Sequence, residues 1–437
     1  MNENEDSVEL RYKDHVKQLK IIQGTDGNKA VDISNLKQET GFITYDPGYQ
    51  NTSAYKSGIS FVDGEKGILR YRGIPIEELA TKSTFVETAY LLIYGNLPEK
   101  KELHTFSRHL NEYSLLHEDM VHFFHNIPQH AHPMATLSMM VNGLSIFYKD
   151  AFDLEGEFTG KEPLDITIAR LISIIRTIAA FSYKKYKGEP FVYPRPDLKY
   201  CANFLNMMFS NPVNPYEIAD EDVKLLNILL TVHADHEQNC STSTVKLVGS
   251  SRVNLYASIC SGICALWGPL HGGANQKVIE MLYNIKRDNL TIKDVLEKAK
   301  RKSEPYRLMG VGHRVYKTFD PRAKILKDIC ATRLTNDRRL DPYFEIALEL
   351  EHSILKDDYF IERNLYPNVD FYSGLLYRSL GIPTNMFTVM FAIGRIPGWI
   401  AQWKEMRDST SKIGRPRQVY VGNNLDHYVP LDLRGQK

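Results

Sequence analysis

The sequence predicts a mainly α, two-domain multi-helical fold with a small N-terminal β region. Strand-like runs broken by Gly, Asp and Pro are confined to residues 1–75. From Ile76 onward, apolar residues recur at spacings of three and four, the period of helices with one buried face. Gly-Gly and Gly-Ile-Pro interruptions then predict a large domain made of 76–272 and 381–437, with a small domain, 273–380, inserted between its two pieces. Such hinges suit closure over a ligand.

Composition excludes several classes of protein. With 437 residues, 43% hydrophobic and 24% charged, the chain is globular rather than disordered. Its 54 Lys and Arg balance 53 Asp and Glu, so we expect neither nucleic acid nor a membrane as a partner. The most apolar stretch, 166–181, contains Arg170 and Arg176 and is expected to be a buried helix. Few cysteines, with Cys260 and Cys264 expected to be buried, and an N-terminus unlike a signal peptide predict a cytoplasmic protein.

His271 precedes two glycines and a helix that is expected to begin near Ala274. The positive end of the helix dipole disfavours the imidazolium form. A neutral histidine at such a place can stabilise a carbonyl oxygen by donating a hydrogen bond. A capping or packed histidine is the alternative, and this stretch alone leaves both open.

His313 follows a glycine-rich loop. Gly310-Val-Gly312 resembles the start of a dinucleotide fingerprint, but Val315 stands where the third glycine belongs, and no βαβ unit surrounds it. We therefore expect a loop with exposed amides that holds an adenine, a phosphate or a pantetheine chain.

Two acidic residues are expected at helix starts. Asp320 has the chemistry of an N-cap, and Arg322 falls in the first turn, where it suits a carboxylate; a solvated surface arginine is the alternative. Asp370 precedes a helix expected from about Ser373 to Leu380. Helix amides would lower its pKa and aromatic neighbours would raise it, so a catalytic base and a plain N-cap both fit.

Two further histidines and two further arginines are candidates for binding a substrate or an anion. His233 and His236 are three apart on one face, without the spacing or the Glu of zinc proteases, so we expect substrate hydrogen bonding or a satisfied buried pair. Arg395 lies among apolar residues, including Phe391, and an arginine in such surroundings meets an anion, either a substrate or a side chain. Arg415 lies in a basic segment near the C-terminus.

Six motifs together resemble the citrate synthase family. They follow the family's order and spacing within about 21–425, and they are HADHEQN, GPLHGGAN, MGVGHRVYKTFDPRA, NVDFYSG, FAIGRIPGW and RPRQVY. Three more stretches resemble the bacterial type II subgroup, namely DGEKGILRYRGIPIEELA, YLLIYGNLP and FLNMMF. None of the motifs would suffice alone, but six in one order are specific.

The resemblance implies a citrate-synthase-like two-domain fold and an acyltransferase reaction of the tricarboxylic acid cycle. The family condenses acetyl-CoA with oxaloacetate and hydrolyses citryl-CoA, with no metal and no cofactor beyond acetyl-CoA as a substrate. By resemblance, Asp370 removes a methyl proton, His271 stabilises the enol, and His313 polarises and protonates the ketone.

The resemblance also implies the binding residues. On the oxaloacetate side, Arg322 and Arg395 would hold the carboxylates, and the remaining contacts would be His236, Phe391 and His233. On the CoA side, the implied residues are Leu308, Met309, Gly310, Val311, Gly312 and Lys317.

The subunit arrangement is implied in the same way. Arg415 resembles the arginine that the family supplies across a dimer interface, so a homodimer would be needed for a complete site. Type II enzymes are allosteric hexamers, and the members that NADH inhibits carry a cysteine shortly after FLNMMF. Val213 stands at that place here, so we expect a hexamer and leave NADH inhibition open.

Other functions remain as alternatives. A 2-methylcitrate synthase would use propionyl-CoA with the same catalytic residues, and one methylene changes transition-state binding by only ~1–3 kcal/mol. The type II stretches favour citrate. The presence of all three catalytic residues disfavours an inactive metabolite-binding protein, and the histidine spacings disfavour a metal-dependent hydrolase.

Overall fold

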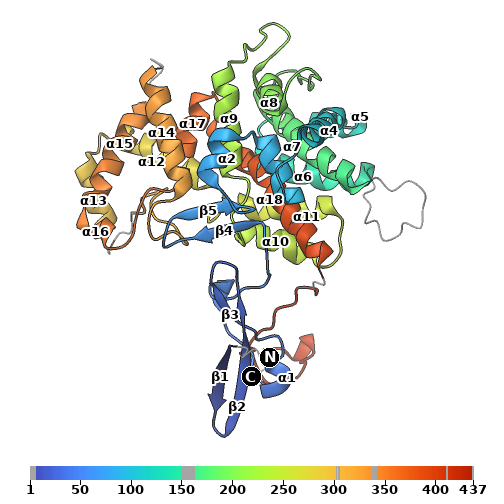
Figure 1. The fold of residues 1–437 in the computed structure, drawn as a ribbon, viewed down its shortest axis with the longest axis vertical. Coiled ribbons are helices and arrows are strands. Elements are labelled where there is room, and N and C mark those ends of the chain that lie inside the picture. Colours follow the sequence, from blue (N-terminus) through green and yellow to red (C-terminus); the bar gives the residue numbers. More distant parts are fainter. Residues whose placement is uncertain are drawn as a thin grey trace. The chain divides into compact units, whose positions relative to one another are not determined.

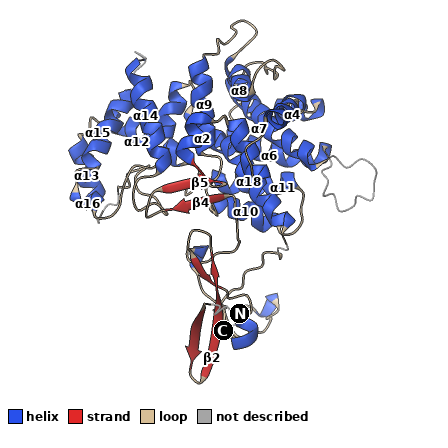
Figure 2. Ribbon diagram, in the orientation of Figure 1, coloured by secondary structure: helices blue, strands red, loops and turns tan. Residues whose placement is uncertain are grey.

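Helices dominate the described part of the chain, and the strands lie before residue 76, as the sequence predicts (Figure 2). The computed structural model describes residues 6–148, 163–301, 303, 306–336, 342–409 and 412–435. Two units emerge from it, one formed by Met1–Lys56 with Arg415–Lys437 and the other by Ser57–Gly414. The prediction of a mainly α fold with a small N-terminal β region is confirmed.

The first unit carries a three-stranded antiparallel sheet. Its strands are β1 (Ser7–Tyr12), β2 (His15–Gln23) and β3 (Lys29–Val31), paired in the order β1-β2-β3. The short elements beside them are α1 (Leu36–Thr40), η1 (Pro47–Tyr49) and η3 (Leu431–Leu433). Leu19 and Leu36 provide its buried apolar side chains.

The second unit begins with a small antiparallel sheet. Its strands are β4 (Ser60–Asp63), β5 (Ile68–Tyr71) and β6 (Ile74–Pro75). In the hairpin of β4 and β5, Ser60 pairs with Tyr71. The period-2 alternation of strands turns Leu69 and Tyr71 inward, and both are fully buried.

Helices form the rest of the second unit (Figure 1). The first half contains α2 (Ile76–Lys82), α3 (Phe85–Tyr94), α4 (Lys100–Glu112), α5 (Glu118–Asn126), α6 (Pro133–Phe147), α7 (Leu164–Lys187), α8 (Tyr200–Phe209), α9 (Asp220–Val232), α10 (Cys240–Gly249) and α11 (Leu255–Trp267). The second half contains α12 (Ala274–Arg287), α13 (Ile292–Lys300), α14 (Pro321–Asn336), α15 (Pro342–Ile354), α16 (Asp358–Ile361), α17 (Val369–Ser379), η2 (Thr384–Met386) and α18 (Phe387–Asp408). Helices α12 to α17 lie together at one side of this unit in Figure 1.

Helix α18 runs through the core of the second unit. It packs against α3, α9, α10 and α11, and nearly all of its side chains are buried. Two glycines let the end of α9 approach it closely. A Cβ at Gly394 would lie 3.1 Å from the carbonyl oxygen of Leu230, and one at Gly398 would lie 2.1 Å from that of Ala234. This close packing fixes the position of Arg395 between the two glycines.

The apolar stretch at 166–181 lies in the buried helix α7, as predicted. Arg176 is fully buried there, where it donates to the carbonyl of Tyr200 (3.0 Å) and lies 4.4 Å from the centroid of that ring. No helix in the described residues is long and apolar enough to cross a membrane.

Two local predictions from the sequence are wrong. Cys264 is exposed and Cys260 is only partly buried, because the buried stripe of α11 passes through Ile259 and Ile263 instead. The helix expected from Ser373 begins earlier, at Val369. By contrast, the helix expected near Ala274 does begin there. The division into a large domain and a small domain of 273–380 stays a prediction.

Candidate active site

The turn between α9 and α10 presents two neutral histidines. His233 Nδ1 donates to the carbonyl of Leu229 (2.6 Å), and burial lowers the pKa of His233 to about 3. His236 Nε2 lies 3.1 Å from the hydroxyl of Tyr316, and burial lowers the pKa of His236 well below its usual value. Asn239 ends the turn as the N-cap of α10.

His236 and His313 come from distant segments and meet beside Tyr316. The ring centroids of His236 and His313 are 5.5 Å apart, and that of Tyr316 lies 5.5 Å from His236 and 4.9 Å from His313. The three rings therefore form one cluster. The sequence analysis did not single out Tyr316.

Backbone amides fix the tautomer of His313. The N–H groups of Val315 and Tyr316 both donate to His313 Nδ1, at 3.1 and 3.2 Å. An amide N–H only donates, so Nδ1 carries the lone pair and the ring proton of the neutral form lies on Nε2. Burial, followed by the charge of Arg322, lowers the pKa of His313 to about 4. His313 thus presents a neutral N–H donor.

His271 is held by the opposite nitrogen. The backbone N–H of Ser241, at the start of α10, donates to His271 Nε2 (3.2 Å), and the Ser241 hydroxyl lies 2.9 Å from the same atom. The proton of the neutral ring therefore lies on Nδ1. Burial and the charge of Arg395 lower the pKa of His271 to about 4. The sequence predicted the influence of the following helix, whereas the contact comes from the N-terminus of another helix, α10.

The glycine loop joins the His313 segment to the start of α17. Gly310 and Gly312 have φ values of 72° and 82°, which favour glycine. The Gly310 carbonyl accepts from Asn368 N (2.9 Å), and the Gly312 N–H donates to Tyr366 O (2.7 Å). The Met309 N–H contacts the sulfur of Met281 (3.4 Å). Two of the loop amides that the sequence expects to be exposed are thus used within the chain.

Asp370 occupies the first turn of α17, where the sequence expected a residue ahead of the helix. Asn368 is the N-cap, and its side chain accepts from the N–H of Asp370 (2.9 Å), which explains the earlier helix start. Burial raises the pKa of Asp370 to about 6, although the charges of Arg322 and Arg395 act to lower it. A carboxylate with this pKa is ionised at neutral pH and basic enough to take a proton.

Both arginines predicted to bind carboxylates are buried, in different ways. Arg322 makes two parallel bonds to Asp320, Nε to Oδ1 (3.0 Å) and Nη2 to Oδ2 (2.9 Å). Arg395 donates from Nε to the carbonyl of His233 (2.6 Å) and lies 4.9 Å from the Phe391 ring, while its buried Nη1 has no hydrogen-bond partner among the described residues. A buried guanidinium with an unpaired N–H group is suited to receive an anion.

Electrostatics show that these groups share one site. The charge of Arg395 lowers the pKa of His236, His271 and Asp370. Arg322 likewise lowers the pKa of His236 and Asp370. Because such effects weaken with distance, the groups lie near one another. The described residues contain no group of three or more His, Cys, Asp or Glu arranged to hold a metal ion.

The remaining predicted residues are described by their local contacts alone. Lys317 is exposed, and its backbone N–H donates to the carbonyl of Gly64 (2.9 Å). Leu308 is buried, and Val311 bridges to Pro367. Arg415 is exposed and begins the part of the chain that belongs to the first unit, so its role at the site stays a prediction.

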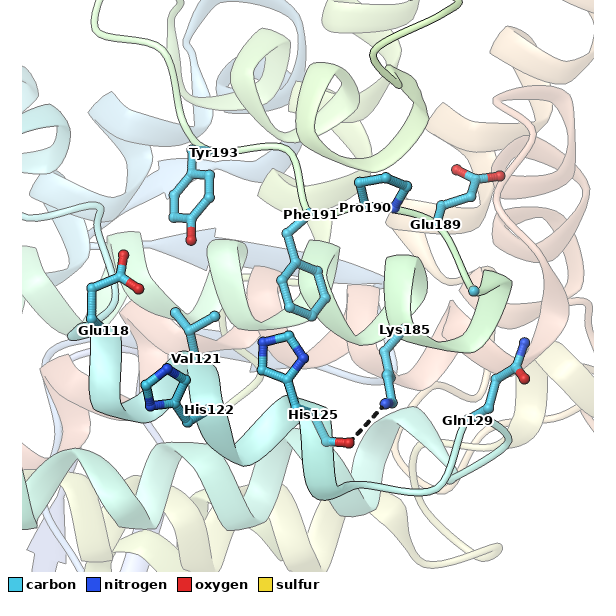
Figure 3. Close-up of a pocket in the computed structure, with 11 residues that line it drawn as sticks. Glu118, Val121, His122, His125, Gln129, Lys185, Glu189, Pro190, Phe191 and Tyr193 are labelled. Carbon is cyan, nitrogen blue, oxygen red and sulfur yellow. Dashed lines mark hydrogen bonds between the residues drawn. The ribbon is translucent and has the colours of Figure 1, made fainter.

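A separate cavity of about 580 Å³ lies beside α5 and the end of α7 (Figure 3). Its lining includes His122, His125, Lys185, Glu118 and Glu189, and it contains none of the predicted site residues. Lys185 Nζ donates to the carbonyl of His125 (3.2 Å), as the dashed line in Figure 3 marks. We assign no chemistry to this cavity.

The comparisons with known proteins agree with one another. The family model described as the C-terminal domain of citrate synthase matches residues 48–417. The chain belongs to the citrate synthase family. It is 50% identical over 435 residues to citrate synthase 1 of Mycobacterium tuberculosis, which covers 99% of this chain and 100% of the relative. It is 48% identical over 427 residues to the citrate synthase of Corynebacterium glutamicum, which covers 97% of each.

Solved citrate synthases share the fold. The enzyme of Pyrobaculum aerophilum matches with a TM-score of 0.79 and 36% identity, over 95% of this chain and 98% of that one. The enzyme of Thermoplasma acidophilum, solved as a ternary complex with carboxymethyl coenzyme A and oxaloacetate, matches with a TM-score of 0.80 and 30% identity, over 90% and 100%.

Sequence reasoning missed three groups that contact the predicted site residues: Ser241, Tyr316 and Asn368. Ser241 acts through its backbone N–H, Tyr316 through its hydroxyl and Asn368 through its side-chain oxygen. Ser241 holds His271 across 30 positions, and Tyr316 meets His236 across 80. Only Asn368 left a local signal, because an Asn two positions before Asp370 is a good N-cap.

Proposed function

We propose that His271, His313 and Asp370 catalyse the citrate synthase reaction in this chain, with oxaloacetate held by Arg322 and Arg395. The observation that carries the proposal is a set of two neutral histidines, with their protons on opposite nitrogens, and a carboxylate with a pKa of about 6, all under the influence of the buried Arg322 and Arg395. The overall reaction converts acetyl-CoA, oxaloacetate and water into citrate and CoA.

Enolisation is the first step. The Asp370 carboxylate removes a methyl proton from acetyl-CoA, and the C–H electrons form the enol double bond as charge moves to the thioester oxygen. His271 Nδ1–H donates to that oxygen, because its Nε2 is already engaged by Ser241. A thioester α-proton is a poor acid, so both groups must act together. A neutral imidazole suits this task, as it donates a hydrogen bond without adding a positive charge that would make Asp370 a weaker base.

Condensation and hydrolysis follow. The C=C electrons of the enol form the bond to the ketone carbon of oxaloacetate, the thioester C=O re-forms, and the ketone oxygen takes the proton of His313 Nε2 to become a hydroxyl. The proton that Asp370 took from the methyl group offsets the one that His313 gives. Water then cleaves the citryl thioester and releases the CoA thiol. No metal and no redox cofactor takes part in these steps.

Oxaloacetate binding uses the buried cations. The unpaired Nη1 of Arg395 would meet one carboxylate, and burial, which lowers the pKa of Arg395 to about 10, strengthens its preference for an anion. Arg322 would bind the second carboxylate while Asp320 holds its guanidinium in place. His236 and Phe391 would complete this side, with His233 behind them.

CoA would lie along the glycine loop. The backbone of this loop is fixed by hydrogen bonds to residues 366–368. The exposed Lys317 suits a phosphate of CoA. The loop residues on the CoA side are Leu308, Met309, Gly310, Val311 and Gly312. The Thermoplasma enzyme, solved with a CoA analogue and oxaloacetate, supports a common site for both substrates.

A homodimer is proposed as the working unit. Helices α6, α10 and α11 and the turn after α11 expose apolar side chains that a second copy would cover, namely Met139, Ile146, Leu247, Trp267 and Leu270. Arg415 would then enter the partner's site. The type II assignment, a hexamer of three dimers, allosteric control and a cytoplasmic location stay predictions from the sequence.

The test of this proposal is release of CoA thiol. Purified protein should release it from acetyl-CoA only when oxaloacetate is present, and EDTA should have no effect. A higher kcat/KM with propionyl-CoA would replace the assignment with 2-methylcitrate synthase. Mixing Arg415→Ala with His271→Ala subunits should restore activity that neither shows alone. No restoration would place Arg415 outside the partner's site.

A further inference from the structure

The hairpin of β4 and β5 contacts both segments that carry the oxaloacetate histidines. On one side, the turn of the hairpin contacts the loop that follows His313. The carbonyl of Gly64 accepts from the backbone N–H of Lys317 (2.9 Å). A Cβ at Gly64 would lie 2.2 Å from the carbonyl oxygen of Val315, so any larger residue must push the loop away. Gly67 is similarly close to Phe319, with a Cβ distance of 2.7 Å to its carbonyl oxygen.

On the other side, the strands hold the turn that carries His236. Ser60 Oγ donates to Asp235 Oδ2 (2.5 Å) and accepts from the N–H of Glu237 (3.0 Å). The Glu237 side chain accepts in return from the N–H of Val62 (3.0 Å). At the end of β5, the hydroxyl of Tyr71 donates to the carbonyl of Asp235 (2.9 Å) and accepts from its N–H (3.2 Å). Both residues that flank His236 are therefore bound to the hairpin.

These contacts stabilise a turn with an unfavourable backbone. Glu237 has a φ of 48°, in the left-handed region that a residue with a side chain rarely adopts. Such a conformation costs about 1–3 kcal/mol and persists only where the surroundings impose it. Asp235 is fully buried as well, and its Oδ2 depends on Ser60 and Gln402 for hydrogen bonds. Without the hairpin, the turn would lose the hydrogen bonds that Ser60, Val62 and Tyr71 make to Asp235 and Glu237.

We propose that the β4–β5 hairpin is a positioning element that sets the separation of His236 and His313, with Ser60 and Gly64 as its key residues. Neither residue is placed among the reacting groups, and both act through the two histidines. The inference rests on the proposed assignment of those histidines to oxaloacetate. Since a shift of about 1 Å in a reacting geometry costs on the order of 10²-fold in rate, small changes at the hairpin should be visible in catalysis.

The first test compares Gly64→Ala with Gly58→Ala. Gly58 lies just before the same hairpin, and a Cβ there would meet only the end of the Arg72 side chain, at 3.8 Å. Gly64→Ala should lower kcat/KM for oxaloacetate by about 10²-fold, whereas Gly58→Ala should leave it unchanged. Wild-type oxaloacetate kinetics in folded Gly64→Ala would overturn the proposal.

A second pair serves if Gly64→Ala fails to fold. Ser60→Ala removes both hydrogen bonds to the His236 turn, and Ser60→Thr keeps the hydroxyl and suits a strand. Ser60→Ala should raise KM for oxaloacetate about tenfold, and Ser60→Thr should keep it near the wild-type value. The comparison holds when the two variants have the same thermal midpoint. Equal kinetics in the two variants would contradict the positioning role of the hairpin. His313→Ala separates the two levels. Full activity of His313→Ala would contradict the assignment of His313 to the site. Loss of activity in His313→Ala together with wild-type kinetics in Ser60→Ala would contradict only the positioning role of the hairpin.

Discussion

His271 and His313 illustrate two ways of building the same kind of group. Both are partly buried, and burial lowers the pKa of each to about 4, so both rings are neutral at pH 7. The N-terminus of α10 engages Nε2 of His271 through Ser241, whereas a tight turn engages Nδ1 of His313 through the amides of Val315 and Tyr316. The two rings therefore offer their protons from opposite nitrogens.

This difference teaches that the backbone, rather than a carboxylate, selects the tautomer at each histidine. An amide N–H only donates, so the ring nitrogen that faces it carries the lone pair as long as the ring is neutral. Because both rings stay neutral, there is no repulsion between two positive charges when both bind the same substrates. Asp370 is then the group in the catalytic set that must be ionised.

The largest expected effect comes from removing that base. Asp370→Asn should lower kcat by about 10²–10⁴-fold, because the methyl proton then has no acceptor. The folded protein should become more stable at the same time. Burial raises the pKa of Asp370 from 3.8 to about 6, so the fold loses stability as pH rises between these two values, and the full loss persists at higher pH. We expect the thermal midpoint of the variant to exceed that of wild type by more at pH 8 than at pH 5. Near-wild-type kcat would exclude Asp370 as the base.

Replacing each histidine separates the two steps. His271→Ala and His313→Ala should each lower kcat by about 10²–10³-fold, the usual loss when one donor to a developing oxyanion is removed. Exchange of acetyl-CoA methyl protons with deuterated water, followed by NMR, should stop in His271→Ala and persist in His313→Ala. Equal exchange in the two variants would break the distinction between enol and ketone donors.

Acid should affect Asp370 before either histidine. As pH falls through about 6, Asp370 becomes protonated, and kcat/KM should drop about tenfold per unit down to pH 5. The histidines stay neutral down to about pH 4, so their protonation does not contribute to the pH dependence of kcat/KM in this range. A profile of kcat/KM between pH 5 and 9 tests this. Activity that rises on acidification would mean that an imidazolium is the active form.

The smallest effect is expected at the cap beneath His271. The Asn239 side chain accepts from the N–H of Thr242 at the start of α10, so Asn239→Ala should cost about 1 kcal/mol of unfolding free energy. Because the same helix start engages His271, kcat should also fall a fewfold. Thr291→Ala, which removes the cap of α13, is the matched control, with a similar loss in urea unfolding and unchanged kcat. A kcat loss in both variants would show that it follows from stability alone.

The sequence predicted the features that depend on local pattern. The helical period located the helix at Ala274, and the glycines before His313 signalled its unusual loop. It failed where a distant partner decides. Asp370 lies inside α17 because Asn368 caps the helix. The amide that holds His271 belongs to a helix some thirty residues earlier in the chain, and spacing within one segment carries no information on such a contact.

If the two histidines are opposite neutral tautomers, ¹⁵N NMR of histidine-labelled protein will distinguish them. Long-range ¹H–¹⁵N correlations at pH 7, assigned with His271→Gln and His313→Gln, report which ring nitrogen carries the proton. We expect the proton on Nδ1 of His271 and on Nε2 of His313. The same tautomer at both positions, or an imidazolium at either, would contradict it.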